Sequence, residues 1–198
     1  SKIIYKTLKR LKSTNNFDIT KNRILDKEIL DMEHTGISLD NDLQNKFNDI
    51  SERLGELSTK FSNNVLDATN KWFLILEKRS QIEGVPERVL ELMALSAQTH
   101  LKKDEKFNPK DGPWKLSLDI PTYTAFMTYG KDRDIREKLY KAFISRASKG
   151  EENNNIIIKE ILELRQIQSN LLGYKSWADL SLSTKMANDI QNVEELLE

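Results

Sequence analysis

Cysteine is absent from this chain, and the 198 residues include only two histidines, four prolines and seven glycines. Without cysteine the chain can form neither a disulfide nor a thiolate metal site, which is compatible with a reducing compartment. No apolar run approaches the roughly 20 residues of a membrane-spanning helix. No signal peptide is recognisable at the start of the sequence. We therefore expect no membrane partner.

An excess of charge of either sign is also missing, because 31 Lys and Arg residues balance 31 Asp and Glu residues. Nucleic-acid-binding domains usually show a basic face. The lysine-rich start is the nearest candidate, and acidic residues from Asp26 to Glu33 soon balance it. We expect no nucleic-acid partner. The remaining composition, 38% apolar and 31% charged, is typical of a helix-rich globular domain.

One long amphipathic helix is predicted from about Asp40 to Trp72, where apolar residues recur every three or four positions. The stripe consists of Leu43, Phe47, Ile50, Leu54, Leu57, Phe61, Val65, Ala68 and Trp72. Fully burying each larger side chain stabilises a fold by roughly 1.5–3 kcal/mol, so this stripe should dock on other elements. On the opposite face, Asn63, Asp67 and Asn70 form a polar line that suits solvent, or hydrogen bonds to another segment or to a peptide.

Shorter helices precede and follow this long helix. Their expected buried faces are Ile4, Leu8 and Leu11; then Ile24, Leu25, Ile29 and Met32; Leu90, Met93, Ala94 and Ala97; Ile135, Leu139, Phe143 and Ala147; Ile158, Ile161, Leu164 and Leu171; and Val193, Leu196 and Leu197. The expected starts are Asp18 or Thr20 for the second helix, Pro86, Asp132, Asn155, and Asn188 or Asp189 for the last. A short helix should begin at Trp177, capped by Ser176. Gly36 and Gly173 stand where helices end.

A small antiparallel strand pair completes the predicted fold, which is mainly α. Residues 72–76 form a continuous apolar run that ends at Glu77, and residues 114–120 alternate with period two before Pro121. The stretch from Lys102 to Pro113 reads as a surface loop. Because both ends of the chain lie inside amphipathic patterns, we interpret it as a piece of a longer polypeptide; fraying terminal helices are the alternative.

Residues for a chemical step are not evident. The histidines, His34 and His100, belong to no His-Glu-x-x-His pattern and are expected at the surface or at helix ends. No glycine-rich phosphate loop is present. Glu151 and Glu152, like Glu194 and Glu195, are adjacent and should diverge as solvated charges. We therefore predict no catalytic, metal-binding or cofactor-binding residue.

Three ordered blocks nevertheless resemble the thimet oligopeptidase family of zinc metallopeptidases, nearest to its oligopeptidase A and dipeptidyl carboxypeptidase branch. The first block is LSTKFSNNVLDAT at residues 57–69. The second comprises LSLDIPTY at 116–123, MTY at 127–129, REKLYKAF at 136–143 and RAS at 146–148. The third comprises ILELR at 161–165, LLGY at 171–174 and LSLSTKMA at 180–187. Their order and spacing fit across essentially the whole chain.

The resemblance implies a largely helical enzyme with two lobes facing a narrow channel that admits short peptides. In such enzymes one zinc ion is held by a His-Glu-x-x-His helix and a downstream Glu, and the motif Glu is the general base. The matched region precedes that motif, so residues 1–198 would form part of the helical N-terminal half, a channel wall without catalytic residues. The implied partners are short peptides and the remaining catalytic region, in a cytoplasmic or organellar compartment.

Several side chains remain open between two interpretations. Tyr123, Tyr129 and Tyr140 could touch substrate, although core packing is expected of them. Arg165 is expected to form an ion pair rather than to clamp a peptide carboxylate. For the chain as a whole, the alternative to an oligopeptidase scaffold is a stand-alone helical interaction protein, because a coiled-coil seam needs the same stripe spacing.

Overall fold

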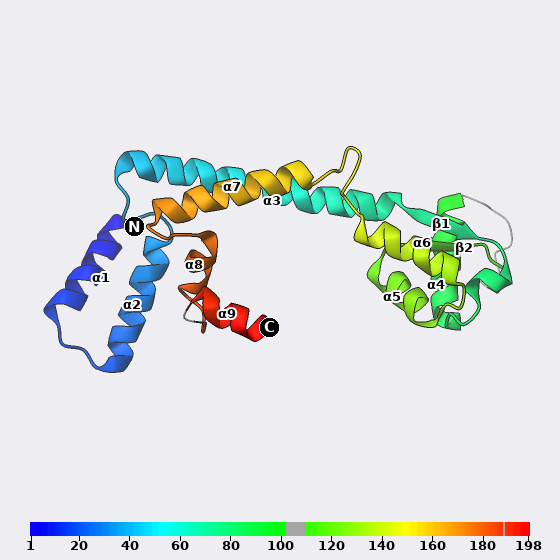
Figure 1. Ribbon diagram of the computed structural model, residues 1–198, viewed down its shortest axis with the longest axis horizontal. Helices are drawn as coiled ribbons and strands as arrows, with labels where there is room; N and C mark the ends of the chain where they lie inside the picture. The colour runs from blue at the N-terminus through cyan, green and yellow to red at the C-terminus, as the bar shows by residue number, and fades with distance from the viewer. Residues whose placement is uncertain (102–109, 188) are drawn as a thin grey trace. The chain divides into compact units, whose positions relative to one another are not determined.

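The computed structural model describes residues 1–101, 110–187 and 189–198 (Figure 1). Within these residues the fold is mainly α, as predicted, with a two-stranded antiparallel sheet. The elements are α1 (Lys2–Thr14), α2 (Ile19–Glu33), α3 (Asn41–Lys71), β1 (Phe73–Leu76), a 3-10 turn (Arg79–Ile82), α4 (Glu87–Leu101), β2 (Trp114–Ser117), α5 (Ile120–Tyr129), α6 (Arg133–Ile144), α7 (Asn155–Leu171), α8 (Trp177–Leu182) and α9 (Ile190–Leu197). The chain divides into two compact units, Ser1–Ser58 with Ile157–Glu198, and Thr59–Ile156.

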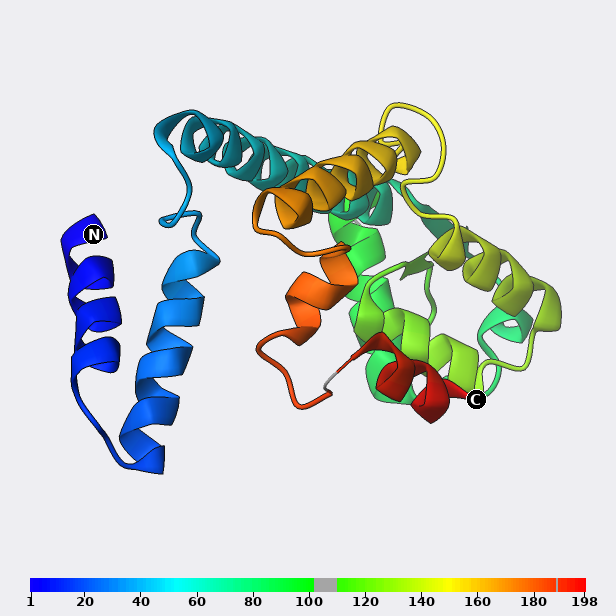
Figure 2. The same ribbon diagram turned by 60° about the vertical axis from the view of Figure 1, so that its left-hand side comes forward.

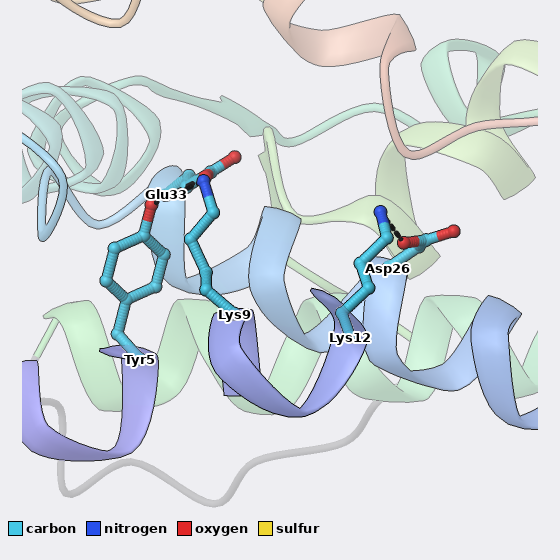
Figure 3. A network of polar contacts seen from close by, with 5 residues as sticks. All are labelled: Tyr5, Lys9, Lys12, Asp26 and Glu33. Carbon is cyan, nitrogen blue, oxygen red and sulfur yellow. Dashed lines mark hydrogen bonds and ion pairs between the residues drawn. The ribbon is translucent and has the colours of Figure 1, made fainter. Parts of the chain in front are cut away.

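In the first unit, α1 and α2 form a hairpin tied by polar side chains (Figure 3). The hydroxyl of Tyr5 donates to Oε1 of Glu33 at 2.7 Å, and Nζ of Lys9 lies 3.1 Å from the same oxygen. Further along, Lys12 pairs with Asp26. Burial of Glu33 opposes its ionisation, but the hydrogen bonds from Tyr5 and Lys9 outweigh this effect and lower its pKa.

The first half of α3 supplies the interior of the same unit. Phe47, Ile50 and Leu57 are buried, and the Asp40 side chain caps the helix by accepting from the Leu43 amide at 2.9 Å. Just before this helix, Gly36 has a φ of +75°, and a Cβ there would lie 2.9 Å from a ring carbon of Phe47. The chain can therefore turn tightly against the phenyl ring only because residue 36 is glycine.

The part of α7 within this unit runs beside α3 (Figures 1 and 2), and polar side chains join the two helices. The guanidinium of Arg53 makes a two-point contact with the Glu160 carboxylate, with N–O distances of 2.6 and 3.1 Å. The Gln168 side-chain amide donates to the Ser51 hydroxyl at 2.9 Å. Gln168 is buried, so this hydrogen bond satisfies a polar group that water cannot reach freely.

The second unit is built on the strand pair. Phe73 lies opposite Ser117 and Leu76 opposite Trp114, so the predicted antiparallel pairing is confirmed. Helices α4, α5 and α6 cover the sheet, and the apolar core consists of Leu76, Ile82, Val85, Leu90, Met93, Ala94, Trp114, Leu116, Leu118, Phe126, Ile135 and Leu139. All four residues expected on the inner face of α4 are buried. This match reflects how strongly an apolar i, i+3, i+4, i+7 pattern fixes a helix face.

Some sequence-based expectations were wrong in detail. The second strand ends at Ser117 rather than residue 120, because Asp119 caps an unpredicted helix, α5, by accepting from the Thr122 amide at 3.1 Å. Ile24 and Ile158 are 57% and 42% exposed, whereas Ile157 is buried in place of Ile158. The apolar residues Ile4, Leu11, Leu196 and Leu197 are also exposed.

Two helix starts left open by the sequence are resolved. Asp18, rather than Thr20, caps α2 by accepting from the Lys21 amide, and Asp189 caps α9 by accepting from the Asn192 amide. Asn188 and residues 102–109 of the predicted loop lie outside the described residues. No helix in the described part of the chain combines the length and the apolar composition that crossing a bilayer requires.

Replacing Glu33 with glutamine should loosen the α1–α2 hairpin. Because the native pKa of Glu33 is lowered, its contribution is present at neutral pH and is lost as the pH falls through the folded-state pKa. We expect E33Q to lower the protection of α1 amides by about 0.5–1 kcal/mol at pH 7, measured by hydrogen exchange. The loss on moving to pH 3 should be smaller in E33Q than in the unsubstituted chain. E28Q, at an exposed position of α2, is the matched control. An equal loss of α1 amide protection in E33Q and E28Q would show that the Glu33 contacts do not stabilise the hairpin.

Candidate functional site

The polar line predicted on α3 is exposed, and the contact with another segment is made by the residue beside it. Asn63, Asp67 and Asn70 face solvent, whereas the Asn64 side chain donates to Oδ1 of Asn154 at 2.8 Å. Asn154 is 3% exposed, and its own side-chain amide donates to the Phe61 carbonyl at 3.1 Å. This buried asparagine therefore ties the second half of α3 to the segment that follows α6.

A groove with a volume of about 660 Å³ lies in the same unit, between the end of α3 and α6. Its lining comprises Ala68, Lys71, Trp72, Leu74, Leu118, Lys138, Lys141, Ala142, Ser145, Arg146, Ala147, Lys149 and Glu152. The sequence places these residues in three separate stretches, and only the fold brings them together. The groove combines an apolar floor with a charged rim.

Ion pairs and a stacked arginine organise this rim. Lys71 pairs with Glu152, and this hydrogen bond lowers the pKa of Glu152 and raises that of Lys71. The Glu152 side chain is only 17% exposed, so the expectation of a freely solvated carboxylate was wrong there. The Arg146 guanidinium carbon lies 3.7 Å from the Phe143 ring centroid, and its Nε donates to the Phe143 carbonyl at 2.9 Å.

The three tyrosines differ in their surroundings. Tyr123 stacks on Phe143 with ring centroids 3.9 Å apart, which confirms core packing for this residue. Tyr129 and Tyr140 are 54% and 48% exposed, so core packing was the wrong expectation for them. Tyr129 lies on α5 and Tyr140 on α6, each at an exposed position. The sequence pattern alone does not show whether a tyrosine ring at such a position is buried or exposed.

The histidines lie at helix ends, as predicted. His34 follows α2, and its Nε2 lies 2.9 Å from the Tyr174 hydroxyl and 3.3 Å from the Ser183 hydroxyl. His100 is in the last turn of α4, with its ring packed edge-on against Phe73. Arg165 places its guanidinium 5.0 Å from the Trp177 ring centroid, a cation–π contact where we expected an ion pair.

The residues present do not fit a zinc site. Among residues 1–101, 110–187 and 189–198, no group of three or more histidine, aspartate or glutamate side chains is placed to hold a metal ion. Zinc in proteins usually takes three or four such ligands.

Comparison with known proteins decides the family. The family model described as "Peptidase family M3" matches residues 126–198. "Probable cytosolic oligopeptidase A" of Arabidopsis thaliana is 39% identical over 100% of this chain and 28% of its own length. "Oligopeptidase A" of Haemophilus influenzae is 35% identical over 98% of this chain and 28% of its own length. The chain belongs to peptidase family M3.

The M3 relatives cover the chain from end to end. "Organellar oligopeptidase A, chloroplastic/mitochondrial" of Arabidopsis thaliana is 38% identical over 100% of this chain and 25% of its own length. The resemblance inferred from the three sequence blocks is thus confirmed. The chain spans about a quarter of the length of these relatives.

Replacing Asn154 with alanine should destabilise the second unit. The change removes two side-chain hydrogen bonds and leaves the Phe61 carbonyl, within α3, without this donor. Removing one partner of a buried hydrogen bond typically lowers the free energy of unfolding by about 1–3 kcal/mol. We expect circular dichroism to show a lower melting temperature for N154A. The control N70A, at an exposed position of α3, should change the melting temperature little. An N154A chain as stable as N70A would show that the contact contributes little.

Proposed function

We propose that residues 1–198 are the scaffold and channel wall of a zinc-dependent oligopeptidase that hydrolyses short peptides. The supporting observation is the end-to-end match with proteins named oligopeptidase A, at 35–39% identity, over only about a quarter of their length. In this proposal the chain belongs to the helical N-terminal half of the parent protein, and the catalytic residues lie in its remainder.

The structure of the two units supports a positioning role. Within each unit, hydrogen bonds and ion pairs join residues far apart in sequence, such as Arg53 with Glu160 in the first unit and Asn64 with Asn154 in the second. Such contacts hold helices in a fixed arrangement without offering a nucleophile or a general base. The sequence also contains no His-Glu-x-x-His. We propose that one zinc ion is bound outside these residues and that short peptides and the catalytic remainder are the partners.

For location, we propose the cytoplasm, with an organelle as the alternative. Two relatives with nearly equal identity carry the words cytosolic and chloroplastic/mitochondrial in their names. Fractionation of cells that express the complete gene product would separate the two locations.

The purified chain by itself should show no peptidase activity and no tight zinc binding. The expected result is no hydrolysis of a quenched fluorescent peptide by the metal-supplemented chain, together with zinc-dependent hydrolysis by the complete gene product. Hydrolysis by the pure chain would contradict the scaffold role. A complete gene product without a downstream His-Glu-x-x-His, inactive on every short peptide, would favour the stand-alone interaction protein.

The isolated chain should also self-associate through exposed apolar side chains. Met186, Ile19, Leu196, Leu197 and Ile3 are each more than three-quarters exposed in the structure. Leu196 and Leu197 are neighbours on α9, and contiguous exposed apolar surface normally marks a site that another protein segment covers. We expect the weight-average mass in sedimentation to rise with concentration, and less so after L196S and L197S are combined. A monomer over a hundredfold concentration range would contradict this expectation.

A further inference from the structure

The rim of the groove between α3 and α6 carries an excess of positive charge. Its cationic side chains are Lys71, Lys138, Lys141, Arg146 and Lys149, and its one lining carboxylate is Glu152. The chain as a whole is neutral, so this local excess is not a consequence of composition. A cleft with charges of one sign and apolar walls concentrates ligands of the opposite sign.

Two of these cations are available to a ligand. Lys71 pairs with Glu152, Lys141 pairs with Glu137, and Arg146 is held by Phe143 and Thr69. Within the described part of the chain, neither Lys138 nor Lys149 has an ion-pair partner. Lys138 lies on α6 and Lys149 just beyond it, and both line the groove.

The floor between these cations is apolar. It is formed by Trp72, Leu74, Leu118 and Ala142; Leu118 is buried and the others are half-buried. An isolated inorganic anion would leave this floor in contact with water. A ligand that carries both carboxylates and a large apolar side chain would satisfy the rim and the floor together. The volume of about 660 Å³ is within the usual range for ligand sites.

We propose that this groove binds an acidic peptide segment that inserts a large apolar side chain between its cations. The ligand is a peptide in trans rather than a nucleic acid, because the floor is mostly aliphatic and only Trp72 among the lining residues offers a ring on which a base could stack. The proposal does not depend on peptidase activity. A negative result here would leave the oligopeptidase proposal intact, and an inactive parent protein would leave this site intact.

Fluorescence anisotropy with labelled hexapeptides tests the site on the full 198-residue chain. The probe alternates glutamate and leucine; one control peptide replaces glutamate with lysine, and a second replaces leucine with serine. We expect the first probe to bind, with about tenfold weaker binding of the serine peptide and no binding of the lysine peptide. Binding should weaken strongly in 1 M salt, because the Debye length there is only about 3 Å.

Matched charge reversals locate the site. K138E combined with K149E changes two cations of the groove, and K159E combined with K175E makes the same net change on exposed lysines outside it. The groove variant should lose affinity by about tenfold or more, whereas the control should change it less than twofold. Circular dichroism should show both variants to be as helical as the unsubstituted chain.

Three results would overturn the proposal: equal binding of the acidic and basic peptides, equal weakening by the two double variants, or no binding at 1 mM peptide. A fourth concerns the parent protein. If the acidic probe binds this chain but is excluded from the complete gene product, the groove is occupied there by another segment of the same polypeptide, and a peptide ligand in trans is wrong.

Discussion

The apolar stripe of α3 is the constraint on which the rest of the structure depends. A 31-residue helix with one continuous apolar face cannot be stable unless other elements cover that face. Phe47, Ile50 and Leu57 are buried in the first unit, and Phe61, Val65 and Trp72 continue the stripe half-buried in the second. The covering segments come from far along the chain, and they are held there by specific polar contacts. Arg53 with Glu160, and Asn154 with Phe61 and Asn64, each join residues about a hundred positions apart.

Much of this fold could be predicted from spacing alone. The bounds of α3 and the whole buried face of α4 follow from apolar periodicity, and the strand pair follows from an apolar run beside an alternating one. Prediction failed where two local signals competed. The alternation from Trp114 continues in burial as far as Leu118, but Asp119 accepts a backbone hydrogen bond and starts α5 instead. Ile157 and Ile158 are equally apolar neighbours, so only packing decides which one is buried.

The candidate site was far less predictable. Glu152 looks like one of a solvated pair until the fold brings Lys71 beside it, and Asn154 is one of three successive asparagines. No local pattern distinguishes a buried, bridging asparagine from a loop residue, because its partners are about 90 positions away. The family could be inferred from the sequence, because the three blocks that resemble the oligopeptidases keep their order along the whole chain. A scaffold role of the kind proposed depends on how side chains are arranged in space, whereas sequence motifs reveal catalytic and binding residues.

A scaffold and a ligand-binding surface are compatible in one segment. The buried contacts of α3 use residues that solvent barely reaches, and the groove uses the outer ends of lysine side chains on α6 and just beyond it. Substitutions should therefore separate the two properties. Changes to the interior should alter stability, and changes to the rim should alter binding.

The most direct test of the scaffold assignment is L57A in the complete gene product, with melting temperature and kcat on a short peptide measured together. Leu57 is 2% exposed, and truncations of buried leucine usually cost about 2–5 kcal/mol. The account predicts a clearly lower melting temperature with kcat within about threefold of the unsubstituted enzyme well below that temperature. An unchanged melting temperature with a hundredfold loss of kcat would contradict it, because α3 would then take part in the chemistry.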